Sequence, residues 1–379
     1  MKHSRLDLKF LFQGIMQFNI LRNILIMFDI VMKTPHEFYT TILTQSIAAL
    51  KINTFMDNFD ERHFNFDGVD RSKTFNAEAS TFYFDWFFRN HQSLWSVYEL
   101  LADEHSKILY ANIIAFRLAS HFSIRLPVSF VNRQEELEEF NKVATCTDSE
   151  LGTNGMFGKL KHYNFYYKGN QYLFDGTTLE YCLFRNQYFY ERNDISIKPE
   201  PGETVIDGGA CLGDTAAVFS YAVGQHGKVL SFDPVKENLS VLEYNVNQFP
   251  LKNVTIIPFG LSNINAFCEP VSLGGYSPGF RASTPNIPLR TLDNMVTNNE
   301  IGTFHFIKMD IEGSELNALA GAELCLSKFK PKLAISLYHN PDDLFTIPLY
   351  IKQKHPFYSM HIDQYTIHND ETVLYCIAK

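Results

Sequence analysis

The feature that most constrains this chain is an apolar run that ends in an acid and is followed by closely spaced glycines. The run ends at Asp207, and Gly208, Gly209 and Gly213 follow before a helical pattern begins. Glycines at a strand-to-helix turn let the backbone approach a ligand where a Cβ would collide. This pattern predicts a parallel α/β unit with a ligand at its first turn.

A second acid supports this prediction. Asp233 ends the next apolar run, about 20 residues after Gly213, which is where a nucleotide-binding βαβ unit holds ribose hydroxyls. The two features together indicate a cofactor that contains ribose. A purely structural glycine turn is the alternative, and Asp233 disfavours it.

The cofactor could be NAD or S-adenosylmethionine. The spacing of Gly208, Ala210 and Gly213 imitates a dinucleotide fingerprint, so the glycines alone do not decide. Asp207, however, would repel a pyrophosphate and would suit a cofactor with a cationic amino acid end. The charge argument favours S-adenosylmethionine, which has an ammonium and a sulfonium group and lacks phosphate.

Two further segments place chemistry at strand ends. An apolar strand near 304–310 delivers Asp310, with Glu312 directly after it, and His339 follows the strand near 332–338. Ligands bind outside the carboxyl ends of the strands in open parallel sheets. The two carboxylates could orient a hydroxyl or accept its proton, and His339 could act as a general base. The alternatives are that Glu312 caps a helix starting near Ser314 and that His339 only packs.

Composition excludes some classes of function. The 379 residues carry a formal net charge of −9, which disfavours a nucleic-acid substrate. The six cysteines form no CxxC pair, so no zinc or dithiol motif is readable, and no metal is expected. Unpaired cysteines predict a cytoplasmic protein. Cys211 is the one candidate nucleophile, but Asp207 and Asp214 beside it would raise the pKa of its thiol.

The apolar N-terminal stretch 10–32 contains Arg22 and Asp29, so a membrane-spanning helix is not expected. No small-residue cleavage pattern follows, so a secretory signal is not expected either. An ordinary docked helix is favoured over peripheral membrane contact.

Periodicity predicts the remaining organisation. Residues 36–120 are mostly helical, 57–76 form a loop, 134–140 are helical, and 163–174 form a β-hairpin around Gly169-Asn170. From residue 203 onward strands alternate with helices. The strands are expected at 204–207, 228–233, 254–259, 304–310 and 332–338, and the helices at 213–223, 236–247, 314–328 and 342–353.

This alternation predicts a doubly wound, mostly parallel α/β sheet with helices on both faces. An antiparallel hairpin at 358–366 and 372–378 ends it. We expect three parts: a helical region over 1–130, a connecting segment with a β-hairpin over 131–198, and a cofactor-binding domain over 199–379.

The C-terminal part resembles the FkbM family of S-adenosylmethionine-dependent methyltransferases, which have a class I Rossmann-like fold. The resemblance spans roughly 200–379. It rests on Val205 to Thr215, Phe232 to Asn238, Leu289 to Asp293 and Phe306 to Leu316. Residues 94–118 also look like a helical region of some bacterial members.

The resemblance implies roles for individual residues. Asp207, Gly209 and Gly213 would hold the methionine end of the cofactor, and Asp233 would accept the ribose hydroxyls. The loop from Phe259 to Asn263 would lie near the adenine. The full predicted cofactor set is Asp207, Gly208, Gly209, Gly213, Asp214, Asp233, Ser262 and Asp310. The residues facing the transferred methyl group would be Asp310, Glu312 and His339. Cys211 departs from the family by replacing the middle glycine of its turn.

The family implies O-methylation of a sugar, a glycan or a small metabolite, with His339 or Asp310 as the base. The rival functions are an NAD-dependent oxidoreductase and a Rossmann-like protein that binds without turnover. We expect no nucleic-acid partner and no integral membrane segment, and the oligomeric state stays open.

Overall fold

The computed structural model describes residues 31–50, 77–121, 123–128, 133–151, 158–268 and 287–379. The chain forms two compact units. The first comprises residues up to 127 together with 366–369, and the second comprises 128–365 and 370–379. The sequence-based boundary near residue 198 falls within the second unit, and the division into three parts stays a prediction.

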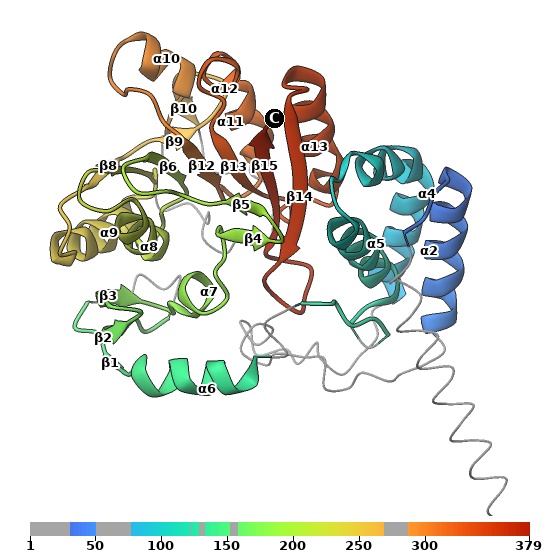
Figure 1. The fold of residues 1–379 in the computed structure, drawn as a ribbon, viewed down its shortest axis with the longest axis horizontal. Coiled ribbons are helices and arrows are strands. Elements are labelled where there is room, and N and C mark those ends of the chain that lie inside the picture. The colour runs from blue at the N-terminus through green and yellow to red at the C-terminus, as the bar shows by residue number, and fades with distance from the viewer. Residues whose placement is uncertain (1–30, 51–76, 122, 129–132, 152–157, 269–286) are drawn as a thin grey trace, which may run out of the picture. The chain divides into compact units, whose positions relative to one another are not determined.

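The described part of the first unit contains three helices: α2 (Pro35–Ala49), α4 (Ala77–Leu100) and α5 (Glu104–Ala119). The helix face predicted at residues 94, 97, 98 and 101 is buried, because α4 packs against α5 and α2 (Figure 1). Asp103, which interrupts the sequence pattern, starts α5 as its N-cap and accepts the Ser106 N–H at 2.8 Å. The structure thereby separates the two predicted helical faces with a capped helix start.

A seven-stranded sheet forms the centre of the second unit, in the order β14-β15-β13-β12-β6-β7-β8. Its strands are β6 (Thr204–Gly208), β7 (Lys228–Phe232), β8 (Val254–Ile257), β12 (Phe306–Met309), β13 (Lys332–Ser336), β14 (Tyr358–Gln364) and β15 (Thr372–Ala378). The five strands from β13 to β8 are parallel, and β15 pairs antiparallel with both β13 and β14. The predicted strands and terminal hairpin are confirmed, most of them slightly shorter than predicted and β6 one residue longer.

The chain runs outward from β6 to β7 and β8 and then returns to β12 on the other side of β6. The carboxyl ends of β6 and β12 therefore lie side by side at the point where the strand order reverses, with Gly208 beside Met309. A doubly wound sheet binds its ligands at this switch point. The topology thus brings Asp207 and Asp310 to one place, although they are far apart in sequence.

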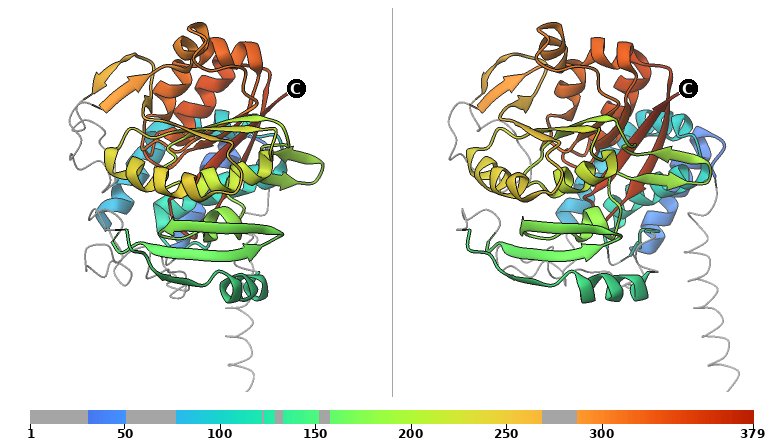
Figure 2. Two further views of the ribbon diagram at one scale, coloured as in Figure 1. Left: turned by 90° about the vertical axis from the view of Figure 1, so that its left-hand side faces the viewer. Right: turned by 60° about the vertical axis from the view of Figure 1, so that its left-hand side comes forward.

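Helices cover both faces of the sheet, as predicted. In Figure 2, α8 (Asp214–Val223) and α9 (Lys236–Gln248) lie below the sheet. On the opposite face lie α11 (Glu315–Ala320), α12 (Glu323–Phe329) and α13 (Asp343–Lys354). A small sheet of β9 (Gly260–Leu261), β10 (Ala266–Cys268) and β11 (Ile287–Arg290) leads into α10 (Leu292–Thr297).

The connecting segment up to residue 176 adds a further layer beneath α8 and α9 (Figure 2), whereas residues 195–197 pack against β13 and β15. The whole segment contains α6 (Gln134–Val143), β1 (Cys146–Asp148), β2 (Lys161–Tyr167), β3 (Asn170–Gly176), α7 (Glu180–Leu183), β4 (Tyr190–Arg192) and β5 (Ile195–Ile197). An aromatic core that includes Phe165 and Phe174 packs against Leu212 and Val218. Asn245 of α9, fully buried, donates to the Asp175 and Leu212 carbonyls at 2.8 and 2.7 Å, so this layer is tied directly to the glycine turn.

Two local predictions are wrong. The hairpin turn consists of Lys168 and Gly169, with φ of 47° and 82°, while Asn170 already pairs with Tyr167 in the strands. Two successive positive φ values are typical of a type I′ turn, which matches the twist of the strands. The helix predicted over 314–328 is in fact two helices, α11 and α12, that meet at Gly321 and Ala322.

Within the described residues, no helix combines the length and the apolar character needed to cross a membrane. Most of the expected N-terminal helix over 10–32 and all of the expected loop over 57–76 lie outside the described residues.

Candidate active site at the switch point

The glycine turn between β6 and α8 needs residues without side chains. Gly209 and Gly213 have φ of 76° and 97°, in the left-handed region. A Cβ on Gly209 would lie 1.9 Å from the Asp310 carbonyl oxygen. The Gly209 and Ala210 N–H groups both donate to the Phe232 carbonyl at 2.9 Å. The turn is therefore wedged between β7 and the residue that follows β12, as the sequence predicts.

Asp207 lies under this turn and is fully buried. Its carboxylate accepts hydrogen bonds from Thr215 at 2.9 Å and Ser231 at 3.2 Å, and lies 3.5 Å from the Lys308 ammonium. Burial raises the pKa of Asp207, although Lys308 acts in the opposite direction. Lys308 therefore offsets the negative charge that the sequence argument assigned to this position, and direct cofactor contact by Asp207 stays a prediction.

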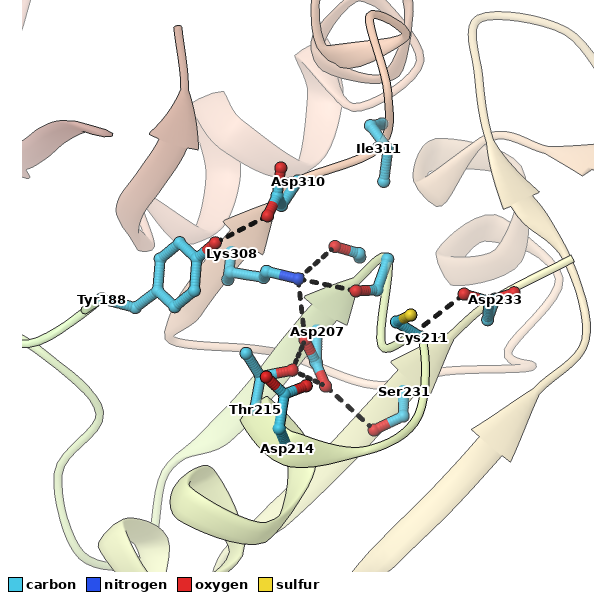
Figure 3. A network of polar contacts seen from close by, with 12 residues as sticks. Tyr188, Asp207, Cys211, Asp214, Thr215, Ser231, Asp233, Lys308, Asp310 and Ile311 are labelled. Carbon is cyan, nitrogen blue, oxygen red and sulfur yellow. Dashed lines mark hydrogen bonds and ion pairs between the residues drawn. The ribbon is translucent and has the colours of Figure 1, made fainter. Parts of the chain in front are cut away.

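Lys308 is the main residue that the sequence-based reasoning missed. Its Nζ donates to the carbonyls of Gly208 and Gly209 at 3.0 and 2.7 Å, and Figure 3 shows it between Asp207 and Asp310. The signal was a lysine inside an otherwise apolar strand, where all residues of β12 are buried. A buried lysine requires partners of opposite charge or carbonyl groups, and this one locks the turn to the next strand.

Asp233 faces the turn from the end of β7. Its carboxylate accepts the backbone N–H groups of Cys211 and Val235 at 3.0 and 2.9 Å. Burial raises the pKa of Asp233 to about 6. Burial, together with Asp233 and Asp214, also raises the pKa of the Cys211 thiol, which opposes a role for Cys211 as a nucleophile.

The remaining predicted cofactor residues surround the same turn. Asp214 is the first residue of α8, and its carboxylate lies 3.5 Å from the Cys182 sulfur. Burial raises the pKa of Asp214. Ser262 follows β9 and donates its N–H to the Arg290 carbonyl at 3.0 Å. All of these assignments as ligand contacts stay predictions.

Asp310, at the end of β12, is the centre of a polar cluster. Its carboxylate accepts hydrogen bonds from the hydroxyls of Tyr188 and Tyr338, both at 2.8 Å. Its Oδ1 lies 3.3 Å from Nε2 of His339. Burial opposes ionisation of Asp310, but the charges of Lys308 and His339 outweigh it and hold its pKa below the ordinary value.

His339 follows β13 and is surrounded by carboxylates. Its Nδ1 lies 3.0 Å from Oε1 of Glu315, and its Nε2 lies 3.6 Å from Oε2 of Glu312. Burial lowers the pKa of His339, but Glu315, Asp310 and Glu312 together raise it to about 10. The structure thus brings all three predicted acceptor-side residues together.

The N-cap residue of the next helix is Ser314 and not Glu312. Glu312 and Gly313 have φ of 58° and 91°, so the chain makes a left-handed turn before α11. Ser314 is the N-cap, without a side-chain cap hydrogen bond. Instead, Glu315 reaches back from α11 and accepts the Ile311 N–H at 2.7 Å. The turn thereby presents Glu312 to His339.

Three residues that contact Asp310 or His339 could not be predicted from the sequence. Tyr188 lies in the connecting segment, 122 residues before Asp310. Tyr338 and Glu315 stand inside the motifs that were singled out, but nothing in their spacing assigned them a partner. Their roles depend on which strand ends the topology places together.

Comparisons with known proteins agree with this geometry. Residues 207–365 match the family model described as Methyltransferase FkbM domain. None of the curated proteins matches the chain. Among solved structures, the chain is similar to a methyltransferase FkbM from Methylobacillus flagellatus KT, at 22% identity and a TM-score of 0.50. The match covers 77% of this chain and 60% of that protein.

Weaker similarities involve two other methyltransferases, each matching 48% of this chain and 84% of the other protein. One is an S-adenosylmethionine-dependent methyltransferase from Aquifex aeolicus, at 18% identity and a TM-score of 0.31. The other is a precorrin-6y C5,15-methyltransferase from Geobacter metallireducens GS-15, at 11% identity and a TM-score of 0.33.

The fold is therefore the predicted class I Rossmann-like fold. Residues 207–365 are similar to the methyltransferase FkbM domain family, and the cofactor that this similarity supports is S-adenosylmethionine.

Proposed function

We propose that this protein methylates a hydroxyl oxygen of a sugar, a glycan or a small metabolite. The observation that carries the proposal is the position of Asp310. Its carbonyl abuts Gly209 of the cofactor turn, while its carboxylate joins His339 and two tyrosines. One residue thus connects the cofactor side of the switch point with a group of acids and bases. We expect the protein to be cytoplasmic, since its described cysteines are unpaired.

The residues of the turn fit the cofactor. Gly209 lets the turn lie directly against Asp310 without a side chain between them, and Asp233 ends β7 beside this turn, its carboxylate oriented by the N–H groups of Cys211 and Val235 and by the Asn238 amide. S-adenosylmethionine supplies a methyl group activated by its sulfonium.

The acceptor side orients the nucleophile and takes its proton. Asp310 and His339 are the two candidate bases, and Asp310 is favoured. Its side chain is the more accessible, at 22% exposure against 7% for His339, and a pKa of about 10 keeps His339 protonated near neutral pH. A hydroxyl that donates its proton to Asp310 points its oxygen toward the turn. Glu312, at 40% exposure, would contact the outer part of the acceptor.

Replacement of Asp233 with alanine tests the cofactor assignment. We expect Asp233→Ala to lower the affinity for S-adenosylhomocysteine at least about 100-fold, because it removes the acceptor of the ribose hydroxyls. Isothermal titration calorimetry measures this, with exposed Asp194→Asn as the control. An unchanged affinity would refute the ribose assignment. Binding of NADH in its place would favour the oxidoreductase, and cofactor binding without turnover on a panel of glycans would favour the non-catalytic rival.

The affinity for S-adenosylhomocysteine should also depend on pH. Ribose hydroxyls donate to the ionised carboxylate, and burial raises the pKa of Asp233 to about 6. Binding should therefore be tightest above pH 7 and about tenfold weaker at pH 5, one unit below that pKa. The measurement is calorimetry across this range. Asp233→Asn, which cannot titrate, should bind weakly with no such dependence, and a parallel slope in this variant would contradict the explanation.

A further inference from the structure

Asp310, Glu315 and His339 form a cluster in which several carboxylates surround a single imidazole. The three come from the end of β12, the first turn of α11 and the segment after β13, and one donor atom of each lies within 4.8 Å of the others. Glu312 lies 3.6 Å from His339, and the charge of His339 acts on buried Asp343 of α13. Several carboxylates thus converge on a single imidazole.

An unpartnered buried atom points to what is missing. Glu315 is fully buried. Its Oε1 accepts the Ile311 N–H and contacts Nδ1 of His339, but its Oε2 has no hydrogen-bond partner. A buried carboxylate oxygen without a donor is costly. A proton on His339 offsets one charge and still leaves Oε2 without a partner, whereas a cation among these atoms would satisfy them.

We propose that Asp310, Glu315 and His339 bind a divalent transition-metal ion. The 3.3 Å between Nε2 of His339 and Oδ1 of Asp310 is close to the separation of about 3.4 Å expected for two ligands of a tetrahedral ion with bonds of about 2.05 Å. One imidazole with two carboxylates suits Zn²⁺ or Mn²⁺ better than the all-oxygen preference of Ca²⁺ or Mg²⁺. Tyr188 and Tyr338 already fix the carboxylate of Asp310 by hydrogen bonds, as outer partners of metal ligands commonly do.

The sequence hid this site because its ligands follow no short motif. Asp310 and Glu315 are separated by a left-handed turn, and His339 comes from the next strand. No metal was expected because the sequence contains no readable set of metal ligands, whereas the fold brings these three residues together.

The test uses the full chain after treatment with a chelator and dialysis. Mn²⁺ binding is followed by the loss of the free-ion electron paramagnetic resonance signal, and Zn²⁺ binding by calorimetry. We expect one ion per chain. Glu315→Gln, which keeps the shape of the side chain, should weaken binding at least about 100-fold, and Glu323→Gln on α12 should leave it unchanged. His339→Gln is the second variant if Glu315→Gln fails to fold.

Absence of Mn²⁺ and Zn²⁺ binding at 1 mM, on the order of 10³ above the dissociation constant expected for a built site, would overturn the proposal. Equal affinity in wild type and in a folded Glu315→Gln or His339→Gln variant would overturn it as well. Binding of S-adenosylhomocysteine is measured on the same samples. Its failure would count against the proposed methyl transfer and leave the metal site standing, because ion binding does not require turnover.

Discussion

Asp310→Asn is expected to lower kcat/KM for methyl transfer by about 10²–10⁴-fold, the usual contribution of a positioned acid or base. Asparagine has the same shape and can still accept a hydrogen bond from Tyr338 or Tyr188, whose hydroxyls lie 2.8 Å from the carboxylate. It cannot take a proton, and it loses the charge that faces Lys308 and His339. The chemistry should therefore suffer much more than the fold.

Three measurements make this prediction specific. The thermal midpoint and the affinity for S-adenosylhomocysteine should change little, because the backbone of Asp310 shapes the turn and its side chain points to the acceptor side (Figure 3). Tyr338→Phe should lower the rate by about tenfold or less, since one of two hydrogen bonds remains. Asp194→Asn in an exposed turn should have no effect. Full activity in Asp310→Asn would exclude Asp310 both as the base and as the group that orients the acceptor hydroxyl.

Local patterns predicted the sheet well because each strand is a short apolar run bounded by polar residues. The ends of β6 and β12 follow from Asp207 and Asp310, and the switch point follows from alternation of strands and helices. The residues at strand ends could therefore be placed at one edge before their contacts were known. This is why Asp310, Glu312 and His339 were identified together.

The failures share a physical cause, which is contact between residues distant in sequence. The helix predicted over 314–328 ends its first part at Gly321, which requires glycine because a Cβ there would lie 1.9 Å from the Ser262 carbonyl oxygen. Asp293 then caps the start of α12 by accepting the N–H groups of Leu324 and Cys325 at 3.0 and 2.9 Å. The periodicity of residues 314–328 cannot reveal contacts with Ser262 or Asp293, which lie far away in the sequence. The pairing of Lys308 with Asp207 was missed for the same reason.

Gly209→Ala is expected to destabilise the protein by about 3 kcal/mol or more and to abolish cofactor binding. Two effects add at this position. Gly209 has φ of 76°, which costs a residue with a Cβ about 1 kcal/mol. The new Cβ would also lie 1.9 Å from the backbone oxygen of Asp310. Backbone on both sides cannot rotate away, so β6 and β12 must separate and the bonds from Lys308 to the turn are lost.

Gly169→Ala separates the two effects. Gly169 has a similar φ of 82°, but nothing lies within 4 Å of the position of its Cβ. This variant should lose only about 1 kcal/mol and should bind S-adenosylhomocysteine normally. Urea denaturation gives both free energies of unfolding, and calorimetry gives both affinities. Equal losses of stability would mean that backbone conformation alone requires glycine in the turn. The larger loss at Gly209 would show that the close approach of β12 requires it, because only there does a side chain collide with the strand that delivers Asp310.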